Sequence, residues 1–333
     1  MQHEHRFATF IRALGKGPQT ARSLTRDEAA EAMRMILAGQ VEPVQLGAFL
    51  TLMRVKSETP AEVAGMAQTV QDAVALPAGF PEVRLDWPAY AGKRRRPPWF
   101  VLSALLLAAN GIPVLMHGTA GYDPARVFLP EAMRELGVPP CGSLAQAAER
   151  IGTERFAFVP LSAVSPVLEQ LILLRPLLGL RSPMHTVARH LNPARAGAIL
   201  QGVFHPVYAQ THQAASAILG SARVAVFKGD GGEAERKPDL PCLVRYLLAG
   251  ESSEEDWPAT FDSQRHPDPP GMEPRRLAAV WRGETRDEYG EAAVVGTAAI
   301  ALRLLGEVKA PGDAIDVARC LWRRRPSRCL TAA

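Results

Sequence analysis

The sequence has few cysteines and no long apolar run, and both absences narrow the kind of protein that it can encode. Its four cysteines (Cys141, Cys242, Cys320 and Cys329) stand far apart without a CxxC pair, so we expect reduced thiols and neither a disulfide framework nor a zinc site. The most apolar stretch, residues 100–109, is too short to span a bilayer. The N-terminal residues contain no apolar segment typical of a signal peptide. These features predict a cytoplasmic protein with no membrane partner.

The excess of positive charge is also small. Lysine and arginine exceed aspartate and glutamate by four, which gives a pI near 9.0. Such a balance permits an anionic partner without requiring one. The hydrophobic content of 47% and the charged content of 22% are ordinary for a globular protein, and 333 residues suit two domains.

Residues 1–77 show the apolar spacing of helices. Thr25 precedes one such segment and Glu28 follows three residues later, which is the pattern of an N-terminal capping box. Two further helices are expected before residue 77. The first of these contains the small residues Gly47 and Ala48, which permit either close packing within the chain or a helix–helix dimer interface.

From residue 83 onward, short apolar β segments alternate with helices. The expected strands are 83–86, 112–116, 156–160, 198–203 and 222–227. This alternation predicts a mostly parallel sheet with helices on both faces. The polar, proline-rich segment 250–276 is predicted to be a surface connection with little regular structure. The expected fold is α/β, with a small N-terminal helical domain and a larger α/β domain around a mostly parallel central sheet.

The segment 83–118 contains an expected strand, a turn, an apolar helix and a second strand. In such units ligands bind at the carboxyl end of the first strand, against the helix N-terminus, where free N–H groups attract anions. A phosphate-binding turn needs glycines, because the backbone must approach the phosphate oxygens closely. This turn has the single glycine Gly92, and four consecutive cations follow it at 93–96. The basic turn indicates an anion-facing role, and a solvated basic loop is the alternative.

Several motifs spread over most of the chain carry a family resemblance. They are QLGAFLTLMRVK, GIPVLMHG, FAFVPLSAVSPVLEQLILLRPLLGLRS and LQGVFHP. In these motifs the sequence resembles the anthranilate phosphoribosyltransferases, which have a glycosyltransferase/nucleoside phosphorylase-like fold. The resemblance implies a helical dimerisation domain at 1–77 with a returning helix near 164–178, an α/β domain at 78–333, and a homodimer formed through the helical domain.

The phosphate-binding motifs of that family are altered in this sequence. The pyrophosphate-binding turn Gly-Thr-Gly-Gly-Asp matches residues 88–92, where Pro88 has no N–H to donate and Tyr90 adds bulk. The Lys-His-Gly-Asn motif matches residues 116–119, which lack the lysine. Phosphoribosyl transfer requires that the leaving pyrophosphate be held in place. The resemblance in fold therefore does not extend to the residues that carry the reaction.

The magnesium-binding pair is altered as well. The family's Asp-Glu pair matches Ala234 and Glu235, and the nearby Asp230 and Glu233 leave a metal site open. Arg175 matches an arginine that contacts anthranilate in the family. The remnant of the substrate pocket implied by the resemblance consists of His117, Gly118, Arg175, Asp230 and Glu235. No metal ligand is assigned.

The cationic turn and the segment KGDGGEAER together resemble a YbiB-like branch of the family. That resemblance implies a homodimer that binds nucleic acid without sequence preference and lacks transferase activity. The residues expected to bind single-stranded DNA or RNA are Lys93, Arg94, Arg95, Arg96, Tyr90, Lys228, Arg236, Lys237 and Arg189. Tyr90 and Trp87 are expected to stack on bases, whereas Trp99 and Phe100 are expected to begin a buried helix.

Several of these residues have an alternative interpretation as structural or surface residues. Lys228, Arg236 and Lys237 are alternatively surface charges offset by neighbouring carboxylates. The two histidines that flank Arg189, and His117 after its strand, are alternatively structural.

Two functions from different classes follow. The first is a non-catalytic nucleic-acid-binding homodimer without a cofactor. The second is a phosphoribosyl or other glycosyl transferase with a rearranged site, which would need Mg²⁺ and phosphoribosyl pyrophosphate. The turn at 88–96 discriminates between them. Glycines and an acidic residue there would favour the transferase, whereas the prolines and cations that are present favour the nucleic-acid-binding protein.

Overall fold

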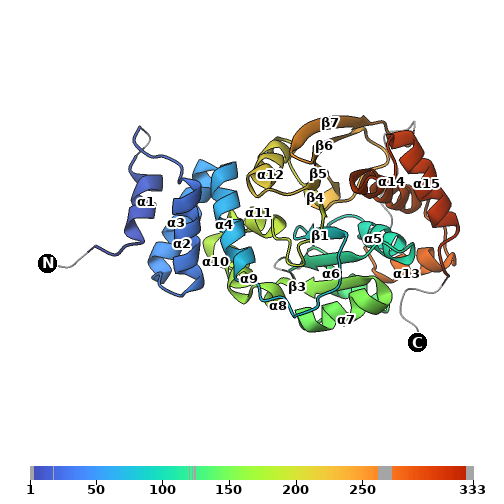
Figure 1. Ribbon diagram of the computed structural model, residues 1–333, viewed down its shortest axis with the longest axis horizontal. Helices are drawn as coiled ribbons and strands as arrows, with labels where there is room; N and C mark the ends of the chain where they lie inside the picture. The colour runs from blue at the N-terminus through green and yellow to red at the C-terminus, as the bar shows by residue number, and fades with distance from the viewer. Residues whose placement is uncertain are drawn as a thin grey trace.

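The computed structural model describes residues 4–17, 19–119, 121, 123, 125–261 and 272–327. Figure 1 shows a helical bundle at the N-terminal end and a larger part in which helices cover both faces of a central sheet. The predicted fold is therefore confirmed: a small N-terminal helical domain and an α/β domain with a mostly parallel sheet.

Four helices begin the chain: α1 (Ala8–Gly15), α2 (Arg26–Leu37), α3 (Pro43–Lys56) and α4 (Pro60–Asp72). α2 begins at the predicted capping box, in which the Thr25 hydroxyl accepts the N–H of Glu28 and the Glu28 carboxylate accepts the N–H of Thr25. α2 and α4 lie very close at Gly65, where a Cβ would be 2.2 Å from the carbonyl oxygen of Arg26. Glycine is required at that crossing.

A second group of helices returns to this bundle: α8 (Leu161–Val164), α9 (Pro166–Leu173), α10 (Arg175–Leu178) and α11 (Met184–Arg189). Leu168 and Ile172 of α9 belong to the same buried cluster as Phe49 and Leu50 of α3. The cluster also contains Val159 of the sheet, so one continuous core joins the bundle to the sheet.

Seven strands form one sheet in the order β3-β2-β1-β4-β5-β6-β7. They are β1 (Leu85–Ala89), β2 (Val114–Gly118), β3 (Phe156–Pro160), β4 (Ala198–Val203), β5 (Arg223–Lys228), β6 (Cys242–Leu248) and β7 (Glu251–Trp257). β1 to β5 run parallel, and β6 and β7 are added antiparallel. The strand order reverses between β1 and β4. Such a switch point opens a crevice at the carboxyl ends of the two strands, where open α/β sheets bind their ligands.

Two strands, 156–160 and 198–203, lie where the sequence predicted them, and the other three are displaced toward the C-terminus. β1 consequently includes Pro88 and Ala89, which the sequence had placed in the turn. Pro88 is tolerated because only Leu85 and Asp86 of β1 pair with β4, so its missing N–H breaks no bond to that neighbour.

The prediction of little regular structure across 250–276 was wrong for the part that the structure describes. β6 and β7 form a hairpin whose turn residues, Ala249 and Gly250, both have positive φ (52° and 88°), as in the tight turns that match strand twist. The acidic composition of β7 concealed it, because an exposed edge strand needs no apolar alternation. Residues 262–271 lie outside the described residues.

The remaining α-helices of the described residues are α5 (Phe100–Ala109), α6 (Leu129–Glu135), α7 (Leu144–Glu154), α12 (Val207–Ile218), α13 (Arg275–Arg282), α14 (Glu288–Leu305) and α15 (Pro311–Arg323). Trp99 and Phe100 are buried at the start of α5, as expected. No helix in the described part of the chain has the length and apolar character to cross a membrane. Cys141, Cys242 and Cys320 are free thiols, and Cys329 lies outside the described residues.

Candidate functional site

The crevice at the β1/β4 switch point is bordered by three loops. The first follows β1 and contains the basic turn, the second follows β4 at Phe204, and the third joins β5 to β6 at residues 229–237. All three emerge from carboxyl ends of parallel strands, so the sequence-predicted location of the site is the place where the fold brings loops together.

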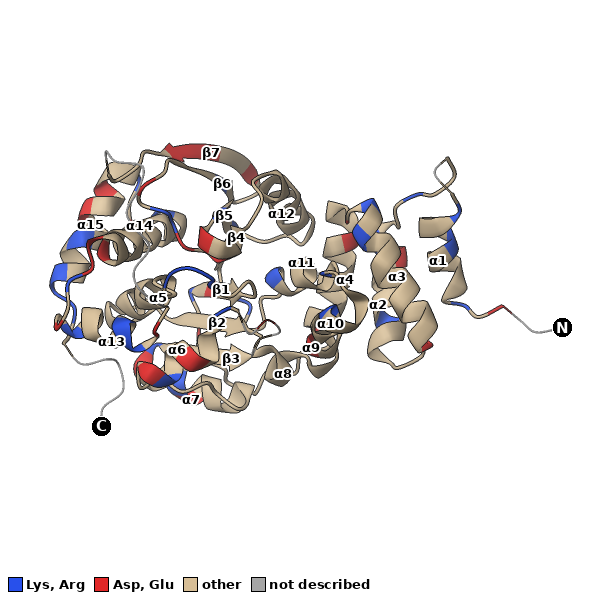
Figure 2. Cartoon of the chain, turned by 180° about the vertical axis from the view of Figure 1, so that it is seen from behind, with Lys and Arg blue, Asp and Glu red and all other residues tan. Residues whose placement is uncertain are grey.

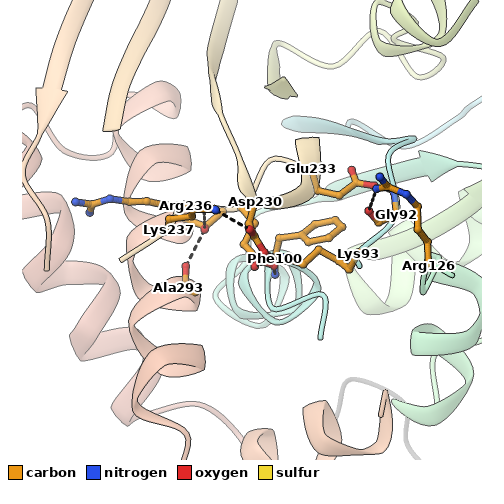
Figure 3. Close-up of polar contacts among 11 residues, drawn as sticks. Gly92, Lys93, Phe100, Arg126, Asp230, Glu233, Arg236, Lys237 and Ala293 are labelled. Carbon is orange, nitrogen blue, oxygen red and sulfur yellow. Dashed lines mark hydrogen bonds and ion pairs between the residues drawn. The ribbon is translucent and has the colours of Figure 1, made fainter. Parts of the chain in front are cut away.

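Lys93 is buried in this crevice, which corrects its assignment to a nucleic-acid-binding surface. Its side chain is 1% exposed, and its ammonium donates hydrogen bonds to the carboxylates of Asp230 and Glu235 (Figure 3). Its backbone is fixed by two hydrogen bonds of 2.8 Å with Val127. A buried cation needs compensating charge, and the two carboxylates supply it.

The protonation of this cluster reflects burial working against charge. Burial raises the pKa of Glu235 to about 7, although the Lys93 ammonium opposes that rise. Burial would also raise the pKa of Asp230, but Lys93, with a contribution from Lys237, holds it at about 2. The second Glu235 oxygen accepts the N–H of Phe100 at 2.9 Å, so the N-terminus of α5 already has an internal anion. Glu235 is thus engaged inside the protein, whereas Asp230 is paired with Lys93 and Lys237 and is 15% exposed.

Glu233 occupies the anion-binding position of the turn. Its Oε1 accepts the N–H groups of Ala91 and Gly92 at 2.7 and 2.6 Å, and the side chain is 2% exposed. Arg126 donates to the carbonyl oxygens of the same two residues at 3.0 Å. Figure 3 shows Glu233 and Arg126 meeting at Gly92. The backbone groups that could bind a phosphate therefore already bind an internal carboxylate.

Tyr90 and Trp87 are both 0% exposed, so the prediction that they stack on bases was wrong. The Tyr90 hydroxyl lies 2.6 Å from His117 Nδ1, and His117 Nε2 lies 3.1 Å from Asp86. Burial raises the pKa of Tyr90 and of Asp86. His117 is a structural residue of this buried network. Gly118 is equally interior, because a Cβ there would be 2.2 Å from the Ala89 carbonyl oxygen.

Three further cations of the predicted nucleic-acid set are largely buried. Arg189 is 9% exposed and its guanidinium donates to the carbonyl oxygen of His185 at 2.9 Å, so only a small part of it reaches a cavity. The Arg96 guanidinium lies 3.5 Å from the ring centroid of Tyr289, and its residue is 7% exposed. Arg236 is 2% exposed, its N–H donates to Thr297 and its guanidinium donates to the carbonyl oxygen of Pro258. The assignments of Arg96 and Arg236 are corrected, because each side chain packs against the C-terminal helices or the β7 end.

The cations that do face the crevice form a basic cleft made of two adjoining cavities. The larger, of about 330 Å³, is lined by Arg54, Arg126, Arg175, Arg181 and Arg189, with Glu58 as its carboxylate. The smaller, of about 250 Å³, is lined by Arg94, Arg95, Arg126 and Lys237, with Asp230 as its carboxylate. Arg126 and Phe204 line both cavities, so the two adjoin at these residues. Of the predicted residues, Arg94, Arg95 and Lys237 line the smaller cavity, and the largely buried Arg189 lines the larger one with Arg175 of the remnant pocket.

The charge of the larger cavity comes from guanidinium groups. His185 also lines it, but burial and the neighbouring arginines lower the pKa of His185 to about 3, so it is neutral near pH 7. Asp123 lies 3.6 Å from Arg175 and 3.4 Å from Arg126, and its pKa is lowered by the N–H of Ala125 and by these arginines. Lys228 is exposed at the end of β5, paired in register with Val203, and lines neither cavity.

The sequence reasoning missed Arg54, Arg126, Arg181 and Phe204. Arg54 comes from the helical domain, and its guanidinium donates to the Tyr208 hydroxyl at 3.3 Å, which no local pattern could indicate. Phe204 could have been found, because it directly follows the strand on the far side of the switch point. The internal role of Glu233 could not, since its backbone partners lie about 140 residues earlier in the chain.

A divalent cation does not fit the residues present. Among the residues that the structure describes, no group of three or more histidine, cysteine, aspartate or glutamate side chains could hold a metal ion. Asp230 and Glu235 share the Lys93 ammonium, which supplies the positive charge that a metal would otherwise bring.

Comparisons with known proteins agree with this architecture. Residues 8–74 match the family described as "Glycosyl transferase family, helical bundle domain". The uncharacterized protein YbiB of Escherichia coli (strain K12) is 32% identical over 207 residues, which are 61% of this chain and 64% of that protein. The anthranilate phosphoribosyltransferase of Methylorubrum extorquens (strain PA1) is 30% identical over 289 residues, or 83% of each chain.

A solved structure extends the likeness to the whole fold. The anthranilate phosphoribosyltransferase of Thermus thermophilus superposes with a TM-score of 0.79 at 23% identity, covering 99% of this chain and 100% of that one. This superposition shows that the two chains share the same fold. The chain belongs to the anthranilate phosphoribosyltransferase family.

Proposed function

We propose that this protein is a non-catalytic, sequence-independent nucleic-acid-binding homodimer, and that its basic cleft binds single-stranded DNA or RNA. The observation that carries the proposal is the exchange of roles at the switch point. The groups that would bind a small phosphate ligand are occupied internally, while arginines and Lys237 line the cleft in front of them. Guanidinium groups suit phosphate oxygens, and phosphates carry no sequence information.

The internal contacts also support the absence of transferase activity. Transfer of phosphoribose requires groups that hold the leaving pyrophosphate and its magnesium. Here Glu233 accepts the N–H groups of the turn, and Asp230 and Glu235 are both paired with the Lys93 ammonium. A phosphate entering the turn would first have to displace a buried carboxylate and would then face its repulsion.

The competing proposal is a phosphoribosyl or glycosyl transferase with a rearranged site. It draws support from the family membership and from Arg175, which lines the larger cavity at the position matched to an anthranilate-contacting arginine. The phosphate and metal positions do not support it.

The dimer proposal is supported by an exposed apolar stripe on α3. Val44 and Val55 are 78% and 77% exposed, and they lie on the helix face that also carries Ala48. Gly47 lies beside Leu178 of the returning helices, and Leu177 there is 82% exposed. Exposed apolar side chains grouped on one face are typical of an interface.

The test of binding compares two charge-matched variants by fluorescence anisotropy on a labelled oligothymidine. Arg94→Ala/Arg95→Ala removes two exposed cleft cations, and the control Arg275→Ala/Arg319→Ala removes two exposed cations from α13 and α15. We expect the cleft variant to bind more weakly at every salt concentration and its log–log salt slope to flatten by about 1.4, because each single-strand phosphate contact contributes about 0.7. The control should retain the wild-type slope. Equal behaviour of the two variants would sink the proposed site.

A turnover assay with anthranilate, phosphoribosyl pyrophosphate and Mg²⁺ decides between the two functions. We expect no product formation above background, because Glu233 occupies the N–H groups of the turn and Lys93 is paired with the two nearby carboxylates. A rate near the enzyme median of about 10 s⁻¹ would establish the competing proposal instead.

A further inference from the structure

Phe204 is an exposed aromatic residue in the middle of the basic cleft. It directly follows β4, its residue is 52% exposed, and it lines both the larger and the smaller cavity. A side chain of this size commonly gains about 1.5–3 kcal/mol when it is fully buried, so a half-exposed position forgoes part of that gain. The position between two cationic cavities suggests a ligand with a flat apolar surface.

The Cβ of Phe204 packs closely against its neighbours. A Cβ on Gly232 would lie 3.2 Å from the Cβ of Phe204 and 3.4 Å from the Cβ of Ala91, so the three residues pack closely. Gly232 has φ +93°, a conformation that favours glycine. The His205 ring packs edge-on against the Phe204 ring, with centroids 4.7 Å apart. These contacts orient the ring and limit the conformational entropy that binding would remove.

The charges on the two sides of Phe204 are alike. Arg54, Arg175, Arg181 and Arg189 line only the larger cavity, Arg94, Arg95 and Lys237 line only the smaller one, and Arg126 lines both. One flat apolar ring therefore separates two groups of cations. A single strand of nucleic acid has the complementary pattern, because each base lies between two phosphates.

We propose that Phe204 stacks on an unpaired base of the bound strand, while the phosphates on either side of that base contact the two groups of cations. This inference rests on the proposed function and adds the strand's path and the class of nucleic acid. Bases within a duplex are covered by their neighbours, so a ring inside a cleft reaches only an unpaired base. Every base has a π-face, so stacking on Phe204 remains tolerant of sequence.

The test separates stacking from charge by using two strands that differ only in their bases. Anisotropy is measured with a labelled oligothymidine, an abasic strand of the same length and a duplex, on wild type, Phe204→Ala and Phe204→Trp. Val207→Ala is the matched control, because Val207 is 76% exposed near Phe204 in sequence but lines neither cavity. Polyglutamate serves as an acidic polypeptide competitor.

We expect Phe204→Ala to weaken binding to oligothymidine by about 5- to 150-fold, equivalent to roughly 1–3 kcal/mol for one stacked base. Its affinity for the abasic strand and its salt slope should stay at the wild-type values. Phe204→Trp should restore binding, Val207→Ala should match wild type, and the duplex should bind more weakly than the single strand.

Three results would overturn the inference. They are an unchanged affinity of Phe204→Ala for oligothymidine, an equal loss on the base-containing and abasic strands, and competition by polyglutamate as strong as that by the oligonucleotide. If wild type binds no oligonucleotide at all, the proposed function fails with it. If wild type binds with a normal salt slope and Phe204→Ala is unchanged, only the stacking inference fails.

Discussion

Removal of the Lys93 ammonium should destabilise the α/β domain, because it leaves the buried Glu235 and the largely buried Asp230 without their shared cation. Lys93 donates to both Asp230 and Glu235, and a hydrogen bond to a charged group contributes about 1.5–3 kcal/mol. Asp230 keeps an ion pair of 3.2 Å with Lys237, whereas Glu235 keeps the uncharged N–H of Phe100. Breaking a buried ion pair by deleting one partner costs about 3–5 kcal/mol. Lys93→Met should lower the free energy of unfolding by that amount at pH 8.

The assay is urea unfolding followed by tryptophan fluorescence. All five tryptophans lie at or beyond residue 87, so the signal reports on the α/β domain alone. Lys237→Met is the matched control, because Lys237 belongs to the same cluster but its side chain is 36% exposed. Exposed pairs contribute about 0–1 kcal/mol, so the control should unfold close to wild type.

The difference in the free energy of unfolding between wild type and Lys93→Met should become smaller as the pH falls. Glu235 has a native pKa of about 7 against an ordinary value of 4.5, and loss of Lys93 raises the native pKa further. A carboxyl whose native pKa is raised binds more protons in the folded state, so stability falls as pH rises from 4.5 through the native pKa. The two proteins should therefore differ least near pH 5 and most above pH 7. A variant within about 1 kcal/mol of wild type at pH 8 would refute the reasoning, because it would match an exposed pair.

Two further predictions concern the turn and the helical domain. Glu233→Ala frees the N–H groups of Ala91 and Gly92, so inorganic phosphate should bind there and raise the melting temperature of the variant. At a phosphate concentration of 100 times the Kd, the free energy of unfolding should rise by about 2.7 kcal/mol. The melting temperatures of wild type and of the control Glu251→Ala, which removes an exposed carboxylate, should stay unchanged. Equal stabilisation of all three proteins would place the phosphate elsewhere. The double variant Val44→Glu/Val55→Glu should convert the expected dimer into a monomer in sedimentation velocity at micromolar concentration, whereas the control Val317→Glu on α15 should not. A double variant that stays dimeric would rule out the α3 face as the interface.

The fold could be predicted from the sequence because local signals and the family motifs agreed. The Thr25 capping box, the alternating apolar segments and the strands at 156–160 and 198–203 needed no knowledge of distant residues. The burial of Tyr90 and Lys93 could not be predicted in this way. Each depends on a partner far along the chain, His117 for Tyr90 and the 229–237 loop for Lys93.

The sequence placed the candidate site at the turn after β1, which borders the crevice in the structure, but several of the residues that it assigned there are buried. A run of four cations suggests one exposed patch, yet the backbone directs Lys93 and Arg96 inward and leaves Arg94 and Arg95 outward. Lys93 is drawn inward by the carboxylates of the 229–237 loop, and Arg96 by the Tyr289 ring. Neither partner is near the turn in sequence.

The acidic edge strand β7 constrains how copies of this protein can meet. β7 ends one side of the sheet, and four of its seven residues are acidic: Glu251, Glu254, Glu255 and Asp256. Figure 2 shows this strand in red at both ends. If two β7 strands paired antiparallel about their centres, Glu254 would face its own counterpart, and like charges directly opposite one another destabilise a pair of strands. Sheet-to-sheet growth into filaments is thereby disfavoured at this edge. The proposed dimer through the helical end of the molecule leaves this edge uncovered, so the charges of β7 would keep such dimers from joining sheet to sheet.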